Sequence, residues 1–155
     1  MRIQLIFAPS LDKPRFDEWY EGHLPPLGIL YLASYLRKTF SGLELKATDG
    51  LLQGMQRTYD EIIEFQPDVL GISVYTAVAL GSYKLIDRIK RALPQILIVV
   101  GGPHPTSLPH DVLNRSHADV VVMGEGEITL SELIGLYLEK GCWNEADLED
   151  IKGIA

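Results

Sequence analysis

The sequence predicts an α/β fold: a doubly wound, five-stranded parallel sheet with helices on both faces. The first indication is residues 96–100, an unbroken aliphatic run that ends in Gly101-Gly102. A run without polar alternation is typical of a central parallel strand, which is buried on both sides. The second indication is that four more strand-like segments alternate with helical periodicity along the chain. This alternation predicts parallel strands joined by right-handed crossovers.

Prolines and glycines separate the strands and helices of this pattern. Pro9-Ser10 ends the first strand, Pro25-Pro26 starts the first helix, and Gly141 is a natural C-cap after the last helix. The expected strands are residues 2–8, 43–48, 68–74, 96–100 and 119–123, and the expected helices are residues 27–40, 59–65, 83–93, 107–115 and 129–140.

The expected strand order is 2-1-3-4-5, the flavodoxin-like order. It places residues 43–48, whose apolar and polar residues alternate, at an edge of the sheet. Ligands of such sheets bind at the carboxyl ends of the strands. Gly101-Gly102 lie at that edge, where they either form a tight turn or let the backbone touch a flat ligand. Residues 10–25 form a long loop at the same edge, and loops of this length are usually functional.

Composition narrows the class of protein. The 155 residues predict one domain, and a hydrophobic content of 46% with 23% charged residues is typical of a globular protein. The net charge of −7 argues against a nucleic-acid surface. A single cysteine, Cys142, excludes a disulfide framework or a cysteine-based cluster within the chain. No apolar run could span a membrane and no signal peptide is apparent, so we expect a cytoplasmic protein.

The loops at the carboxyl edge exclude several ligand classes. They contain neither the G-x-G-x-x-G turn nor the Walker loop that phosphorylated nucleotides prefer. The first strand ends in Ala8-Pro9-Ser10, where a receiver domain carries acidic residues and a flavodoxin carries a Ser/Thr-rich phosphate loop. The edge is instead rich in glycine and hydroxyl groups.

Four segments in order resemble cobalamin-binding domains, which have a Rossmann-like fold. They are residues 25–33 (PPLGILYLA), 68–73 (DVLGIS), 99–106 (VVGGPHPT) and 119–127 (DVVVMGEGE). More narrowly, they resemble the N-terminal domain of cobalamin-dependent radical S-adenosylmethionine (SAM) enzymes, over roughly residues 1–140. The resemblance implies cobalamin (B12) as cofactor, with S-adenosylmethionine and a 4Fe-4S cluster held only by a C-terminal radical SAM domain outside this chain.

The resemblance also implies how individual residues hold the cofactor. Ser73 and Thr76 would line the slot that takes the nucleotide tail, and residues 124–127 would close its far side. Leu27 and Gly28 would lie under the corrin ring. No catalytic or metal-ligating residue is expected. The expected cofactor-binding residues are Ser10, Leu27, Gly28, Ser73, Tyr75, Thr76, Gly101, Gly102, Pro103, His104, Gly124, Glu125, Gly126 and Glu127.

One motif of many cobalamin domains is not matched. They carry Asp-x-His-x-x-Gly after the first strand, and its histidine binds cobalt from below. Here Glu21 precedes His23, and the next glycine is Gly28, so the spacing differs. We therefore expect cobalamin to bind without that lower ligand. His23 remains a candidate ligand, a substrate contact or a solvated side chain, and His104 is either a turn residue or a cofactor contact.

The expected domain organisation is a cobalamin-binding domain over residues 1–141 and a linker over residues 142–155 that leads to the radical SAM domain. That domain would be the partner of this one, and the parent enzyme would catalyse methyl transfer or a radical rearrangement. The chain alone would not be a catalyst, because the iron–sulfur cluster needs three cysteines. Two alternatives stay open: a cofactor-free scaffold or docking domain, and a stand-alone corrinoid methyl carrier.

Overall fold

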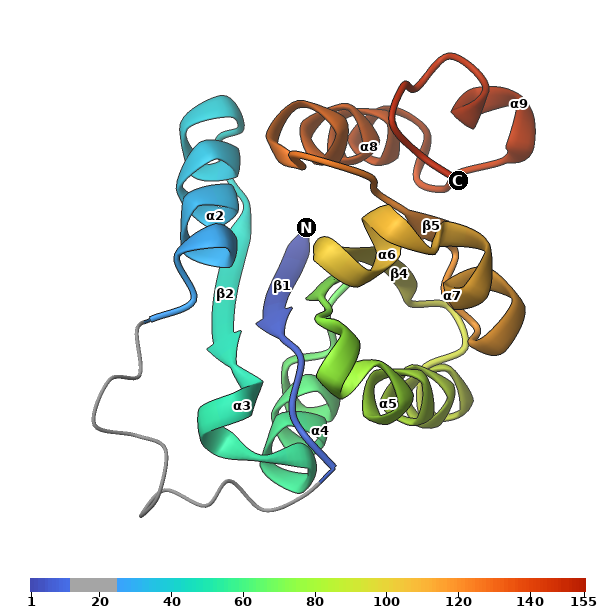
Figure 1. Cartoon of the computed structure of the whole chain (residues 1–155). Helices are drawn as coiled ribbons and strands as arrows, with labels where there is room; N and C mark the ends of the chain where they lie inside the picture. Colours follow the sequence, from blue (N-terminus) through green and yellow to red (C-terminus); the bar gives the residue numbers. More distant parts are fainter. Residues whose placement is uncertain (12–24) are drawn as a thin grey trace.

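The computed structural model describes residues 1–11 and 25–155, and its strands form one sheet in the order β2-β1-β3-β4-β5 (Figure 1). All four strand pairs are parallel, which confirms the expected topology. The strands are β1 (Arg2–Phe7), β2 (Glu44–Asp49), β3 (Val69–Ser73), β4 (Leu97–Gly101) and β5 (Val120–Val121).

Helices cover both faces of this sheet (Figure 1). They are α2 (Leu27–Thr39), α3 (Gly50–Gln53), α4 (Met55–Phe65), the 3-10 helix η1 (Thr76–Val78), α5 (Ala79–Ala92), α6 (Pro103–Ser107), α7 (Pro109–Arg115), α8 (Glu127–Lys140) and α9 (Glu145–Leu148). The buried residues of α2 and α8 pack on one face, and those of α4, α5 and α7 pack on the other. No helix within the described ranges is long and apolar enough to cross a membrane.

Side chains of each central strand alternate between two hydrophobic cores. In β4, Ile98 and Val100 join the core under α4 and α5, while Val99 joins the core under α2 and α8. Because both sides of β4 are buried, its sequence is a continuous apolar run. The edge strand β2 pairs with β1 alone in this sheet and exposes Glu44 and Ala47, whereas the polar Thr48 is buried.

The chain after β4 differs from the expected single helix over residues 107–115. Two short helices form instead, α6 starting at Pro103 and α7 starting at Pro109. Leu108 separates them with non-helical backbone angles, φ −137° and ψ 58°. A proline fits the first position of a helix and pushes the residue before it out of the helical region. The two prolines therefore start two helices and break the chain between them.

Two helices also begin earlier than expected, α4 at Met55 and α5 at Ala79. A short helical segment, α3 or η1, precedes each of them. The Asp49 carboxylate caps α3 by accepting a hydrogen bond from the backbone N–H of Leu52 at 3.1 Å. Apolar periodicity depends on large apolar side chains, and the first turns of these helices contain small or polar residues such as Gln56, Arg57, Gly81 and Ser82, which give no such signal.

Residues 142–155 pack against the sheet beside β5. Val121 and Ala155 exchange two backbone hydrogen bonds of 2.9 Å, and Val122 forms an antiparallel bridge with Ile154. The indole N–H of Trp143 donates to the carbonyl of Leu133 at 2.9 Å. The segment expected to be a linker is thus folded onto the domain.

Candidate functional site

A cavity of about 410 Å³ lies at the carboxyl ends of the central strands, on the face covered by α2 and α8. The strands supply its floor and one wall, α2 and α8 supply the opposite walls, and the loops after β3, β4 and β5 form its rim. The lining residues are Leu5, Gly28, Ile29, Leu32, Gly71, Ile72, Ser73, Tyr75, Val99, Gly101, Gly102, Pro103, Thr106, Val122, Gly124, Glu125, Gly126, Glu127 and Leu130.

Two glycines lie on neighbouring strands of this face, and one of them leaves it hollow. Gly71 of β3 and Gly101 of β4 alternate with Ile72 and Val100, which point to the other core. A Cβ on Gly101 would meet only Val122, at 3.6 Å or more, so a side chain there would extend into open cavity. The missing side chain of Gly101 is therefore space that a ligand can occupy, whereas the space beside Gly71 is taken by Leu5, which a Cβ there would meet at 2.6 Å.

Gly102 is a glycine for a different reason. Its φ is +104°, and a Cβ there would lie 3.0 Å from the backbone nitrogen and oxygen of Val74. The turn is held by hydrogen bonds from Val74 N to Gly101 O at 2.8 Å and from His104 N to Val74 O at 3.2 Å. Gly102 thus meets a backbone need of the strand-to-helix turn, whereas the missing side chain of Gly101 leaves open space in the cavity.

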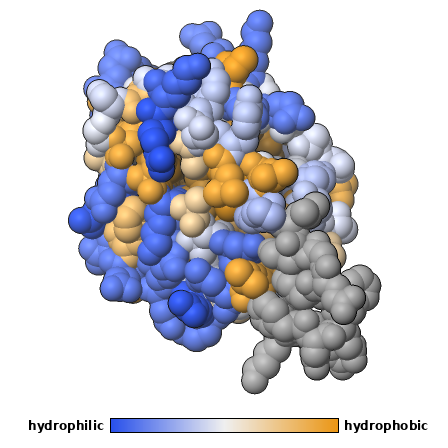
Figure 2. All heavy atoms as spheres, turned by 90° about the vertical axis from the view of Figure 1, so that its left-hand side faces the viewer, coloured by the Kyte–Doolittle hydropathy of each residue, from blue (hydrophilic) through white to orange (hydrophobic). Residues whose placement is uncertain are grey.

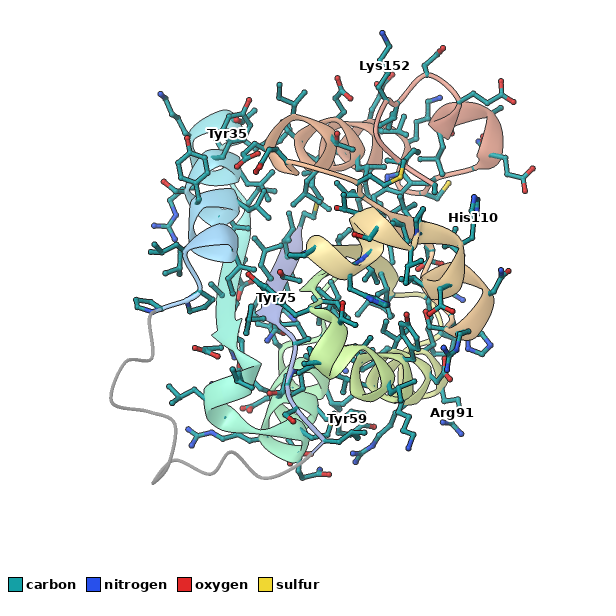
Figure 3. All side chains as sticks on the ribbon, viewed as in Figure 1. Tyr35, Tyr59, Tyr75, Arg91, His110 and Lys152 are labelled. Atoms are coloured by element: carbon teal, nitrogen blue, oxygen red, sulfur yellow. The ribbon has the colours of Figure 1, made fainter. Side chains whose placement is uncertain are left out.

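Hydroxyl and aromatic groups lie at the rim of the cavity. The Thr106 hydroxyl accepts a hydrogen bond from the backbone N–H of Gly124 at 3.0 Å, which joins the loops after β4 and β5. Tyr75, labelled in Figure 3, lies beside the end of β1, with its ring centroid 5.3 Å from that of Phe7. Glu127 begins α8, where the helix dipole stabilises a carboxylate.

An apolar shelf adjoins the cavity at the start of α2. We define it as Leu27, Leu30 and Tyr31 of α2; Leu27 and Tyr31 are each more than 60% exposed and Leu30 is 43% exposed. Figure 2 views the molecule from this side and shows apolar side chains gathered among hydrophilic ones. Gly28 lies in the same shallow groove, and a Cβ there would meet nothing within 4 Å. The shelf is thus open to a large flat ligand.

Four of the expected site residues do not line the cavity: Ser10, Leu27, Thr76 and His104. Leu27 belongs to the adjoining shelf, and Ser10 follows β1 at the same end of the sheet. Thr76 and His104 contact each other on the α5 side of the sheet. The remaining ten expected residues all line the cavity.

His104 belongs to a buried polar network. Its Nε2 lies 2.7 Å from the Tyr83 hydroxyl, which donates to the Asp111 carboxylate at 3.0 Å. Its Nδ1 lies 3.3 Å from the Thr76 hydroxyl. A hydroxyl has one hydrogen, and Tyr83 uses its own toward Asp111, so Nε2 of His104 donates to the Tyr83 oxygen. Burial and the hydrogen bond to Asp111 raise the pKa of Tyr83 to about 12. The network holds the turn after β4, with the imidazole turned away from the cavity.

Sequence reasoning missed the deep half of the cavity. The deep residues it did not name are Leu5, Ile29, Leu32, Gly71, Ile72, Val99, Val122 and Leu130; Thr106 at the rim was not among the expected cofactor-binding residues. A usable signal existed in the strands, because every second residue of a parallel strand points to the same face. Counting back by two from Ser73 and Gly101 reaches Gly71 and Val99. The long loop that carries Trp19, Tyr20 and His23 lies outside the described residues.

Comparison with known proteins identifies the family. Residues 19–134 match the model of the B12 binding domain. An uncharacterised methyltransferase of Pyrococcus horikoshii, PH0819, is 34% identical over 99% of this chain and 31% of its own length. The cobalamin-dependent radical SAM methyltransferase TokK of Streptomyces tokunonensis is 34% identical over 57% of this chain and 13% of its own. The chain therefore belongs to the B12-binding domain family.

A solved structure agrees with the fold. The cobalamin-dependent S-adenosylmethionine radical enzyme OxsB, with aqua-cobalamin and S-adenosylmethionine bound, superposes with a TM-score of 0.79. It is 23% identical over 99% of this chain and 20% of its own length. The chain thus spans about a third or less of the length of these relatives.

The geometry of the site fits cobalamin, which has a flat corrin ring and a nucleotide tail. The cavity offers a deep slot with apolar walls for the tail, left open at Gly101. The shelf beside it offers an exposed apolar surface for the ring. A slot and a shelf that share Gly28 match the two parts of one cofactor.

Proposed function

We propose that this chain is the cofactor-binding module of a larger cobalamin-dependent radical SAM methyltransferase. The observation that carries the proposal is the glycine-floored slot beside the apolar shelf, within a chain of the B12-binding family. Relatives named as methyltransferases support methyl transfer over radical rearrangement. The chain spans only part of each of them, so the further domain, with its S-adenosylmethionine and iron–sulfur cluster, belongs to the proposal.

The residues of this chain would bind and orient the cofactor. Leu5, Val99 and Leu130 bury the tail, and the shelf supports one face of the ring. These side chains would hold the nucleotide base of the cofactor inside the slot. When bound, cobalamin supplies a cobalt centre that can carry a methyl group. The exposed shelf leaves the cofactor accessible to a domain packed against this side.

We further propose that no histidine of this chain binds the cobalt. Within residues 1–11 and 25–155, the histidines are His104, His110 and His117. His104 is engaged on both ring nitrogens, and His117 contacts Asp87 at 2.7 Å on the surface. His110 is exposed on α7 and points away from the molecule (Figure 3). His23 lies outside these residues and has the wrong spacing to Gly28 for the usual motif.

A reconstitution experiment tests the proposed binding. The purified chain is incubated with methylcobalamin, desalted and examined by absorbance spectroscopy. We expect retained corrinoid with the spectrum of a form whose nucleotide base has left the cobalt. Colourless protein after desalting would favour the cofactor-free scaffold instead. Retained corrinoid with the base still on cobalt would contradict the slot assignment.

Electron paramagnetic resonance of the cobalt(II) form tests the ligand. We expect no nitrogen superhyperfine splitting from the protein in the unmodified chain. Splitting that disappears in His23→Ala would identify His23 as the ligand and overturn this part of the proposal. His110→Ala serves as the matched control, because His110 is exposed and away from the cavity.

A further inference from the structure

We propose that the slot selects cobamides by their lower base, accepting an apolar aromatic base such as dimethylbenzimidazole and discriminating against adenine. Cobamides share the corrin ring and differ in the base at the end of the nucleotide tail. The inference rests on the proposed function, because it assumes that the cavity takes this tail. It adds the chemical class of tail that the cavity fits.

The deep part of the slot is apolar on every side that the structure describes. Leu5, Val99, Val122 and Leu130 line it, and each is at most 4% exposed. Gly71 lies among them, where a Cβ would be only 2.6 Å from Leu5. None of these five residues has a polar side-chain atom. A base at this depth therefore meets carbon atoms from the side chains around it.

The backbone offers this part of the slot no free partner either. Gly71 pairs with Leu5 on one side and with Val99 on the other, so β3 is hydrogen-bonded along both edges at this level. Val99 in turn pairs with Val120 of β5. The amides and carbonyls of the central strands are thus used within the sheet.

The polar side chains of the slot lie at its rim. They are Ser73 at the end of β3, Tyr75 after it, Thr106 of α6, and Glu125 and Glu127 around the start of α8. At the level of the rim the hydroxyl groups can donate to the phosphate of the tail, and the two carboxylates can accept hydrogen bonds from its ribose hydroxyls. The slot is therefore graded, from polar at the mouth to apolar at the floor.

This gradient separates the two kinds of base. Dimethylbenzimidazole carries methyl groups on its outer edge, whereas adenine carries an amino donor and ring-nitrogen acceptors. Burying polar groups without partners is costly, because they lose their hydrogen bonds to water. We expect the chain to bind the dimethylbenzimidazole cobamide at least tenfold more tightly than the adenine cobamide, once coordination of the base to cobalt is accounted for.

The test compares three methylated corrinoids on the unmodified chain: cobalamin, the adenine cobamide, and cobinamide, which lacks the nucleotide tail. Dissociation constants come from absorbance titration. The fraction of each free cobamide with its base on cobalt is read from its spectrum and used to correct the constant. A tenfold or greater preference for cobalamin supports the inference.

Two results overturn it in different ways. Equal corrected affinities for the two cobamides, both above that of cobinamide, would remove the selectivity and leave the proposed function standing. Failure of all three corrinoids to bind, or equal binding of cobinamide, would remove the tail slot itself and the inference with it. Comparing the three corrinoids therefore distinguishes a slot without base selectivity from a chain that does not bind the nucleotide tail at all.

A pair of nearly isosteric variants locates the selectivity. Val99→Thr places a hydroxyl on the slot floor, and we expect it to narrow the preference at least threefold by giving adenine a partner. Val100→Thr makes the same change one residue along β4, facing the opposite core, and should leave the preference unaltered. Equal effects of the two variants would contradict a role of the slot floor.

Discussion

The two faces of β3 and β4 differ, although one backbone builds both. On the face toward α4 and α5, Ile72 and Val100 fill the space to the next layer, and the core there is continuous. On the face toward α2 and α8, the neighbouring positions are Gly71 and Gly101, and a cavity of about 410 Å³ remains. Alternate residues of the same strands thus divide the tasks, one set providing stability and the other providing space.

The strongest test of this division places a side chain in the cavity on the face toward α2 and α8. In Gly101→Leu the new side chain extends into the cavity, and we expect cobalamin binding to weaken by about 1000-fold or more, roughly 4 kcal/mol. The midpoint of urea unfolding should change little, because the backbone at this position accepts a Cβ. Gly101→Ala is the graded control with a much smaller loss. Unaltered affinity in Gly101→Leu would place the cofactor elsewhere.

The converse test removes side-chain volume from the core between the sheet and helices α4 and α5. Ile86 of α5 is fully buried in that core, and Ile86→Ala should lower the free energy of unfolding by about 3 kcal/mol. Cobalamin affinity, measured at a temperature where the variant is folded, should stay within about twofold. A large loss of affinity in folded protein would show that the two faces are not independent.

A smaller effect is expected at the polar network beside the slot. Tyr83→Phe removes the hydroxyl that joins His104 to Asp111, and it should cost about 1–2 kcal/mol of stability. Because the network holds the turn after β4 from the α5 side of the sheet, away from the cavity, the affinity for cobalamin should fall only slightly. Tyr59→Phe gives a matched control, because Tyr59 lies on α4, away from the network. Equal unfolding midpoints of the two variants would contradict the role given to the network.

The smallest effect concerns pH and a site remote from the slot. Burial raises the pKa of Glu61, but hydrogen bonds from Thr48 and Gln53 and the charge of Lys46 outweigh it and hold that pKa below its ordinary value. A lowered pKa contributes stability above the ordinary value of 4.5, and this stability is lost as the pH falls through the folded-state pKa. Glu61→Gln should flatten the acid limb of a stability–pH curve, while the exposed Glu64→Gln should not.

The architecture was predictable because it follows from burial patterns. Residues 96–100 are apolar at every position, which indicates a strand buried on both faces, and the alternation in residues 43–48 marks an edge. The rim of the site was predictable too, because glycines and hydroxyls follow strand ends such as Gly101 and Ser73. These signals are local in the sequence.

The depth of the site and the side to which its residues point were not predictable in this way. Gly71 lies inside a strand, and its role depends on Leu5 of the neighbouring strand β1, whose side chain covers it, which is a tertiary relation. Gly101 and Gly102 are adjacent in sequence, but only the backbone angles show that one leaves space and the other forms a turn. The ring of His104 turned away from the cavity because Tyr83 and Thr76 offered it buried partners.

The short strand β5 has a further consequence for how the molecules behave at high concentration. Unpaired N–H and C=O groups along a sheet edge can template the pairing of another chain. Residues 153–155 occupy that edge by pairing with Val121 and Met123. A variant that ends at Lys152 would expose these groups and acquire a route to edge-to-edge aggregation. By pairing with the sheet edge, the three residues Gly153-Ile154-Ala155 thus oppose self-association of the domain.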